Sequence, residues 1–308
     1  MADVNFANLT REIENPNTDV FTISGAIFLI IAIFASLGNS FILYVVNRDP
    51  LKCFNKPTNV FNISLTMAHL FAGVIVLPFA GVLNILRGER PEIVIPPAVV
   101  KLEAFLVNFN VGAATLFLFA ISTERSTAVI APHFNKKWLT MKRAKTICYT
   151  AATSCFVFCL VLFLPGSKTF FYIVYLHAFI FLPACGILAS CAARLRNFRK
   201  LARVSVINSG LPVAQLFARE TRRRNSQLIY KLIVTVFTIL LPVLIALFLF
   251  YALRLIEISC EGCLEKKWFI ILSNVALIFL FLSSPFNPLV LYSRIVEYSR
   301  SIKHIFRK

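Results

Sequence analysis

The sequence predicts an all-α membrane protein, a seven-transmembrane helix bundle that ends in a short amphipathic helix. Three observations predict this fold class: 58% of the 308 residues are hydrophobic, only 15% are charged, and the apolar residues gather in seven long runs. In an ordinary soluble domain about a quarter of the residues are charged, so this chain has too few charges to cover a surface in water.

Each apolar run is long enough to cross a bilayer, whose core needs about 20 mainly apolar residues per helix. The first run is too long for a signal peptide and lacks a basic leader, so we expect it to stay in the protein as a helix. In chain order the predicted spans are Phe21–Val46, Val60–Leu86, Ala104–Ala131, Thr146–Pro165, Phe170–Ala193, Leu228–Leu253 and Trp268–Tyr292.

The last segment, Ser293–Phe306, places Ile295, Tyr298 and Ile302 at helical spacing with basic residues between them. This pattern is typical of an amphipathic helix lying on a membrane surface. We therefore expect a single domain over residues 1–308, with residues 1–20 outside the cell, the bundle at 21–292 and the amphipathic helix at 293–308 in the cytoplasm.

The charged residues predict the orientation of the chain. With the amino terminus outside, the inner side carries 24 basic and 4 acidic residues, net +20, whereas the outer side carries 8 basic and 10 acidic residues, net −2. Because basic residues in short loops favour the cytoplasmic side, the carboxyl terminus should lie inside. The net charge of +18 thus indicates contact with an anionic inner leaflet and excludes nucleic acid as a partner.

Two motifs at the inner ends of spans carry the strongest functional signal, since polar groups within a membrane are costly. Glu124-Arg125-Ser126 ends the third span, and Asn287-Pro288 with Tyr292 ends the seventh. With Asn39 in the first span and a proline in each of the second, fourth, fifth and sixth (Pro78, Pro165, Pro183, Pro242), the chain resembles the rhodopsin-like (class A) G-protein-coupled receptors over almost its whole length.

The resemblance implies a receptor of the plasma membrane that passes the signal of an extracellular ligand to a heterotrimeric G protein. It implies that Glu124 pairs with Arg125 at rest and that Pro242 kinks the sixth helix as the lever of activation. A proline also frees a backbone carbonyl in the seventh helix, which nearby polar groups must satisfy.

The chain departs from the family pattern at several switch positions. His69 stands where the family has a sodium-binding aspartate, so we expect that sodium site to be lost. Two readings of His69 remain open: an interior histidine bonded to Asn39, Ser283 or Ser284, or a proton-sensitive part of the switch. Ser126, Leu240 and Leu291 replace a family tyrosine, tryptophan and tyrosine, respectively.

Cys260 and Cys263 are the cysteines predicted to lie outside, where an oxidising environment favours a disulfide over two free thiols. A metal or redox role is weakly supported, because a lone C-x-x-C pair has no further ligands. Asn8 starts an N-x-T glycosylation motif in the predicted outer segment. The chain lacks the family's main disulfide and has a short second outer loop, and in these two features it resembles the melanocortin, lysolipid and cannabinoid receptors.

The candidate ligand-binding residues are Glu103, Val107, Asn108 and Leu240. Val107 stands where the resemblance places the aspartate of amine receptors, and Phe281 stands where retinal proteins have a lysine, so both ligand types are excluded. A peptide or a lipid is favoured over an amine. If the ligand is cationic, we expect Glu103→Gln to weaken its binding sharply and to leave a neutral lipid nearly unaffected.

Two alternatives remain open. The departures at the switch positions also fit a receptor-like membrane protein that no longer signals. A transporter or channel is less favoured, because the sequence has no internal repeat and no paired acids within the spans. No nucleophile–base or metal constellation is visible, so we predict neither an enzyme nor a cofactor.

Overall fold

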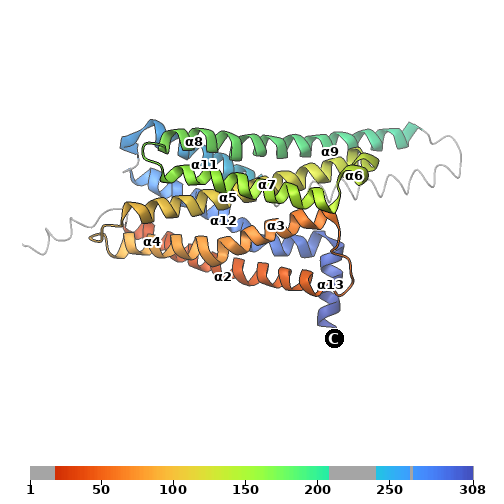
Figure 1. The fold of residues 1–308 in the computed structure, drawn as a ribbon, viewed down its shortest axis with the longest axis horizontal. Helices are drawn as coiled ribbons and strands as arrows, with labels where there is room; N and C mark the ends of the chain where they lie inside the picture. The colour runs from red at the N-terminus through yellow and green to blue at the C-terminus, as the bar shows by residue number, and fades with distance from the viewer. Residues whose placement is uncertain (1–17, 208–240, 264–265, 308) are drawn as a thin grey trace, which may run out of the picture.

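The computed structural model describes residues 18–207, 241–263 and 266–307 (Figure 1). Within these ranges, seven helices are long and apolar enough to cross a membrane. They are α2 (Thr18–Arg48), α3–η1–α4 (Pro57–Phe71, Ala72–Val76, Leu77–Glu89), α5 (Pro97–Ile130), α7–η2 (Met141–Cys159, Leu160–Phe163), α8–η3–α9 (Lys168–Tyr175, Leu176–Phe181, Leu182–Ile207), α11 (Leu241–Ser259) and α12 (Lys267–Arg294). The predicted seven-helix bundle is confirmed.

Several helices extend beyond the ends of the predicted spans. The third begins at Pro97 instead of Ala104, and the fifth continues to Ile207 instead of ending at Ala193. The apolar runs mark only the part of each helix that matches hydrocarbon, and the helical backbone continues beyond it. The start of the predicted sixth span, residues 228–240, lies outside the described residues.

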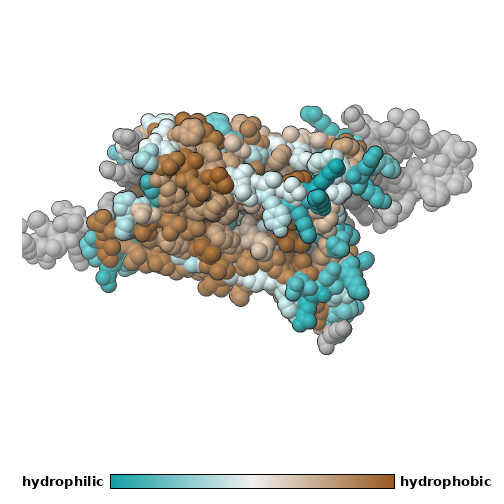
Figure 2. Space-filling view, viewed as in Figure 1, coloured by the Kyte–Doolittle hydropathy of each residue, from teal (hydrophilic) through white to brown (hydrophobic). Residues whose placement is uncertain are grey.

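The spanning helices lie side by side along the long axis of the molecule, and α13 (Val296–Phe306) turns away across one end (Figure 1). Apolar side chains cover the middle of the visible face, and hydrophilic ones gather near the ends (Figure 2). On α2, Ile30, Phe34 and Leu37 are each more than half exposed. Such an outer surface is stable in lipid and unfavourable in water.

Prolines follow interruptions in the regular α-helical hydrogen bonding in two of the spans. Pro78 follows the π-helical turn η1, and Pro183 follows the π-helical turn η3. A proline has no N–H and its ring clashes with the carbonyl one turn earlier, so the helix takes up an extra residue there. One extra residue rotates the rest of the helix by about 100° relative to an uninterrupted α-helix.

Glycines allow the first two spans to approach closely. A Cβ atom added at Gly25 of α2 would lie 2.6 Å from the carbonyl oxygen of Gly81 in α4 and 2.8 Å from a carbon of Ile85. Small residues permit this backbone contact, which is a common way of packing helices in membranes. The contact fixes α4, which carries the polar residues Asn84 and Arg87, against α2.

Two short helices lie at the end of the bundle where the basic loops converge. The helix α6 (Pro132–Trp138) follows the third span and was not predicted from the sequence. In α13, Tyr298 and Ser301 are fully buried, and the Tyr298 ring packs against Phe54 with centroids 4.7 Å apart. The amphipathic segment is thus helical, and its apolar face lies on the bundle itself.

Candidate functional site

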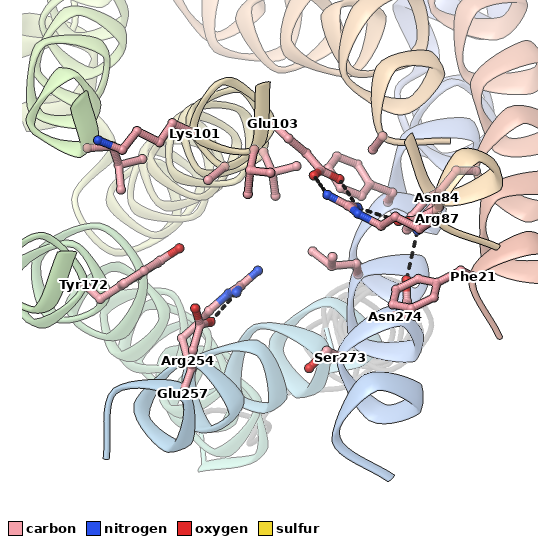
Figure 3. A pocket seen from close by; sticks show the side chains of 18 of the residues that line it. Phe21, Asn84, Arg87, Lys101, Glu103, Tyr172, Arg254, Glu257, Ser273 and Asn274 are labelled. Carbon is pink, nitrogen blue, oxygen red and sulfur yellow. Dashed lines mark hydrogen bonds and ion pairs between the residues drawn. The ribbon is translucent and has the colours of Figure 1, made fainter. Parts of the chain in front are cut away.

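A cavity of about 390 Å³ lies among α2, α4, α5, α8, α11 and α12 at the end opposite α13 (Figure 3). Phe28, Val107 and Phe281 form part of its apolar floor, and the Phe28 and Phe281 rings meet edge to face at 6.4 Å. Six charged residues line the remaining wall: Arg87, Lys101, Glu103, Lys168, Arg254 and Glu257. The cavity therefore combines an apolar base with a strongly charged rim, as ligand sites commonly do.

One side of the rim is an ion pair between the second and third spans. Arg87 donates two hydrogen bonds to the carboxylate of Glu103, at 3.1 and 2.5 Å. It also donates to Asn84 Oδ1 at 2.9 Å, and Asn84 donates to Asn274 Oδ1 at 3.1 Å and Ser24 Oγ at 3.2 Å. The network joins four helices, and it occupies the Glu103 carboxylate that the sequence offered for a cationic ligand.

The other side of the rim is a three-residue cluster between the fifth and sixth spans. Glu257 accepts a hydrogen bond from Arg254 and lies 2.9 Å from the ammonium of Lys168. The Arg254 guanidinium also lies over the ring of Tyr172, 5.7 Å from its centroid. Two cations thus share one carboxylate at this wall.

Asn108 lies beside the cavity without lining it. Its side chain donates to the carbonyl of Ala104 at 2.7 Å, and its own carbonyl accepts a hydrogen bond from the Tyr175 hydroxyl at 2.6 Å. Asn108 therefore joins the third span to the fifth. Leu240 lies outside the described residues.

A polar layer crosses the middle of the bundle. The His69 ring nitrogen Nδ1 lies 2.8 Å from Ser284 Oγ, one of the partners expected for an interior histidine. Asn39 donates to the backbone carbonyl of Ser284 at 3.0 Å, and this is the carbonyl that Pro288 leaves without its helical donor. Asn287 donates to Thr66 at 3.3 Å. The structure thus joins Asn39 and His69 through Ser284, and it links Asn287 separately to Thr66 in the second span.

The end of the third span that leads into α6 carries a charged pair. Glu124 has a side chain only 7% exposed, and it accepts a hydrogen bond from Thr58 at 3.0 Å. Arg125 Nε lies 3.6 Å from the other carboxylate oxygen of Glu124, and the arginine side chain is 42% exposed. Ser126 points elsewhere, donating to the carbonyls of Ser122 and Ser190 at 2.9 and 2.8 Å. Ser126 therefore ties α5 to α9.

Two other predicted switch residues lie apart from these networks. Helix α12 continues to Arg294, so Leu291 faces the core at 3% exposure and Tyr292 faces outward at 40%. Pro242 is the second described residue of α11 and is exposed. In the part of the chain that the structure describes, neither residue makes a side-chain hydrogen bond or ion pair with Glu124, Arg125 or His69.

Comparison with known proteins agrees with this geometry. The family model of the seven-transmembrane receptors of the rhodopsin family matches residues 38–171. The match covers less than half of the 308 residues and shows a similarity to this receptor family in that part of the chain. The match contains Asn39, His69, Glu103 and the Glu124–Arg125 pair, and it ends early in the fifth span.

The curated proteins that this chain resembles include receptors named for peptides. The cholecystokinin receptor type A of Oryctolagus cuniculus is 29% identical over 135 residues, covering 44% of the chain, and that of Homo sapiens is 29% identical over 132 residues, covering 43%. The neuropeptide FF receptor 2 of Mus musculus is 24% identical over 143 residues, covering 46% of the chain. The alignments span 30%, 29% and 32% of these relatives' own lengths, respectively.

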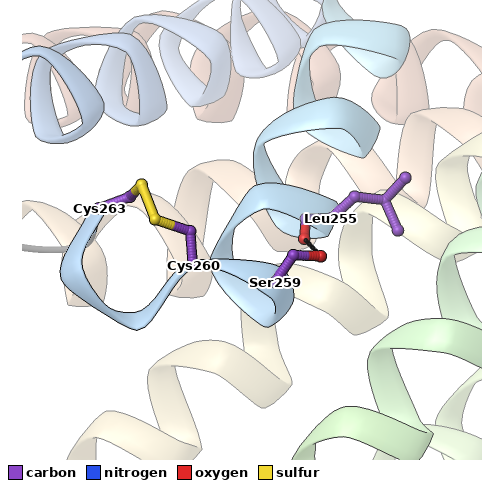
Figure 4. Close-up of a disulfide and its surroundings, with 4 residues drawn as sticks. All are labelled: Leu255, Ser259, Cys260 and Cys263. Atoms are coloured by element: carbon purple, nitrogen blue, oxygen red, sulfur yellow. Dashed lines mark hydrogen bonds between the residues drawn. A yellow bond between two sulfur atoms is a disulfide. The ribbon is translucent and has the colours of Figure 1, made fainter.

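A disulfide links Cys260 to Cys263 in the loop between α11 and α12 (Figure 4). Cys260 directly follows the end of α11, three residues beyond the Glu257 carboxylate. The proposed glycosylation site Asn8 lies outside the described residues.

The prediction from the sequence missed most of the charged rim of the cavity. It selected Glu103 and overlooked Arg87, Lys168, Arg254 and Glu257, because all four lie at or near span ends where charged residues are common. One local feature of the sequence could have indicated two of them, because Arg254 and Glu257 are one helical turn apart and face the same way.

Proposed function

We propose that this protein is a receptor that carries an extracellular signal to a heterotrimeric G protein on the cytoplasmic side of the plasma membrane. The observation that carries the proposal is the pairing of buried Glu124 with partly exposed Arg125 at the inner end of the third span. It is supported by the seven-helix fold and by the family match over residues 38–171.

The geometry of the inner pair suits a switch. Glu124 is held in place by Thr58, whereas its contact with Arg125 is longer than a hydrogen bond. Arg125 can therefore leave its partner at a small cost, and a guanidinium with free donors can then bind backbone or side-chain oxygens of a protein partner. Glu124 would remain bonded to Thr58 in that state.

The proposed topology places the amino terminus outside and the carboxyl terminus inside, with residues 1–308 forming one receptor domain. The excess of basic residues on the side of α6 and α13 supports this orientation. It puts the charged cavity on the outer side, accessible to a ligand from the extracellular fluid.

For the ligand we propose a peptide in preference to a lipid. The compared relatives are named for cholecystokinin and for neuropeptide FF. The cavity volume of about 390 Å³ is near the lower end for small-molecule sites, which suits one end of a peptide. The resemblance of the outer loops to lysolipid and cannabinoid receptors supports the lipid alternative.

Nucleotide exchange on purified G proteins tests the proposal. The full-length chain in lipid nanodiscs should accelerate exchange on at least one G-protein class, either without ligand or with a peptide pool. Arg125→Ala should abolish the acceleration. Lys137→Ala is the matched control, because Lys137 is an exposed cation of the same inner surface in α6 and should leave exchange unchanged.

Two results would contradict the proposal. Folded protein that accelerates exchange on none of the G-protein classes, with or without peptides, would favour a receptor-like protein that does not signal. An equal loss in Arg125→Ala and Lys137→Ala would mean that the inner surface acts only through its general positive charge.

A further inference from the structure

The charged rim of the outer cavity has more bases than acids. Four basic side chains line it, Arg87, Lys101, Lys168 and Arg254, against the two carboxylates of Glu103 and Glu257. The local charge is therefore +2, although the outer side of the chain as a whole is net negative. A cavity with low-dielectric walls concentrates this field and attracts anions.

Both carboxylates are already engaged. Glu103 is bound through both oxygens by Arg87, and Glu257 is bound by Arg254 and Lys168 through different oxygens. A cationic ligand would have to displace an arginine from one of them. An anionic ligand meets no such obstacle.

Arg254 has donors left for a ligand. It uses one nitrogen, Nη1, for Glu257, and within the described residues its Nε and Nη2 make no hydrogen bond. Figure 3 shows its guanidinium reaching from α11 toward the middle of the cavity, with Arg87 projecting from the opposite wall. The ring of Tyr172 supports the guanidinium plane from one side. This arrangement fixes a planar fork that fits the two oxygens of a carboxylate.

We propose that the outer cavity recognises an acidic peptide, and that Arg254, assisted by Lys168, binds a carboxylate of that peptide. The inference rests on the proposed receptor function for its biological meaning and on the cavity alone for its chemistry. The carboxylate comes from an Asp or Glu side chain or from the peptide's carboxyl terminus.

The position of the cations favours a peptide over an acidic lipid as the occupant. The Lys168 side chain is 61% exposed at the start of α8, and the Lys101 side chain is exposed near the start of α5. Both lie at the ends of helices, where a ligand arrives from water. Deeper in the cavity, Phe28, Val107 and Phe281 offer an apolar floor for an adjoining apolar side chain.

Binding of matched peptides to the full-length chain in nanodiscs tests the proposal. The probes are pools of tetrapeptides with random apolar residues and one fixed position, which is Asp, Asn or Lys with an amidated end, or Asn with a free carboxyl end. Oleate and oleamide form a lipid pair. The readout is the rise in unfolding temperature, followed by the dissociation constant of the best peptide in each pool.

We expect the best Asp peptide, or the best peptide with a free carboxyl end, to bind about tenfold to a hundredfold more tightly than its neutral twin. Arg254→Gln should remove this preference, and Lys168→Gln should reduce it. Glu257→Gln should increase affinity for the anion, because it releases both cations from their shared carboxylate. Arg90→Gln is the control, since Arg90 is an exposed outer cation that does not line the cavity.

Several outcomes would overturn the proposal. These are equal binding of acidic and neutral twins, tighter binding of the Lys pool, an unchanged preference in folded Arg254→Gln, or the same loss in Arg90→Gln. Stabilisation by oleate alone, lost in Arg254→Gln, would replace the peptide with an acidic lipid. The binding assay needs no G protein, so a failure of nucleotide exchange would refute the receptor function without affecting this result.

Discussion

The close contact between the first two spans predicts that a larger side chain at Gly25 destabilises the fold. A Cβ atom at this position would lie 2.6 Å from the Gly81 carbonyl oxygen and 2.8 Å from a side-chain carbon of Ile85. Gly25→Val places two further carbons beyond that Cβ, so α2 and α4 must separate. Overpacking of this kind costs about 1–3 kcal/mol of unfolding free energy, while the change in helix propensity is smaller than 1 kcal/mol.

Thermal unfolding of the purified protein in nanodiscs measures this effect. A loss of about 1 kcal/mol lowers the midpoint by about 2–4 °C in domains of 150–250 residues, so we expect a decrease of about 2–12 °C. Ala26→Val is the matched control, because Ala26 is the next residue of the same helix and is exposed to the membrane side. Equal midpoints for Gly25→Val and Ala26→Val would refute the reasoning.

The displaced helix should also weaken the cavity. Ser24, next to Gly25, accepts the hydrogen bond from Asn84, and Asn84 holds Arg87. Separation of α2 from α4 lengthens this chain of contacts. We therefore expect Gly25→Val to reduce peptide binding as well as stability.

Two further predictions concern the polar layer and the inner end. Ser284→Ala leaves the buried His69 ring nitrogen without its partner and should lower the unfolding free energy by about 1–3 kcal/mol. Ser283→Ala is the control, because the Ser283 hydroxyl bonds only within its own helix. It should change the unfolding free energy by less than half as much in the same thermal assay. At the end of the bundle that carries α13, the hydrogen bond from Lys56 lowers the pKa of Glu297 from its ordinary value of 4.5. The ion pair therefore stabilises the docked α13 above that value and is lost as the pH falls through the lowered pKa. The difference in unfolding temperature between wild type and Glu297→Gln should therefore be present at pH 7 and be lost as the pH falls below the ordinary value of 4.5 through the lowered pKa. A difference that stays constant during this acidification contradicts the assignment.

The apolar runs were sufficient to predict the seven spans, because a membrane helix must satisfy its backbone hydrogen bonds internally and display apolar side chains along the length that crosses the hydrocarbon. The helix ends were predicted less well, since helices such as α5 and α9 continue beyond the residues where the apolar signal stops. The helix α6 is short and polar, with exposed Phe134 and Trp138, and has no periodicity that marks it in the sequence.

The site was harder to predict than the fold, for two physical reasons. First, the π-helical turns η1 and η3 rotate the outer halves of the second and fifth spans, so residue spacing along an ideal helix does not give the face on which Arg87 lies. Second, ion pairs such as Arg87–Glu103 join residues of different helices, and only the packed bundle shows that a lone acid in the sequence is already neutralised.

The docking of α13 has a consequence for how the protein responds to bilayer thickness. Tyr298 and Ser301 are fully buried, and Lys56 pairs with Glu297, so the helix is fastened to the bundle and cannot slide along it. The distance between α13 and the charged cavity at the opposite end of the bundle is then fixed by the protein. In a thicker or thinner bilayer the mismatch must be absorbed by tilting of the whole bundle or by deformation of the surrounding lipid. The chain therefore sets this distance itself, and the surrounding bilayer adjusts to it.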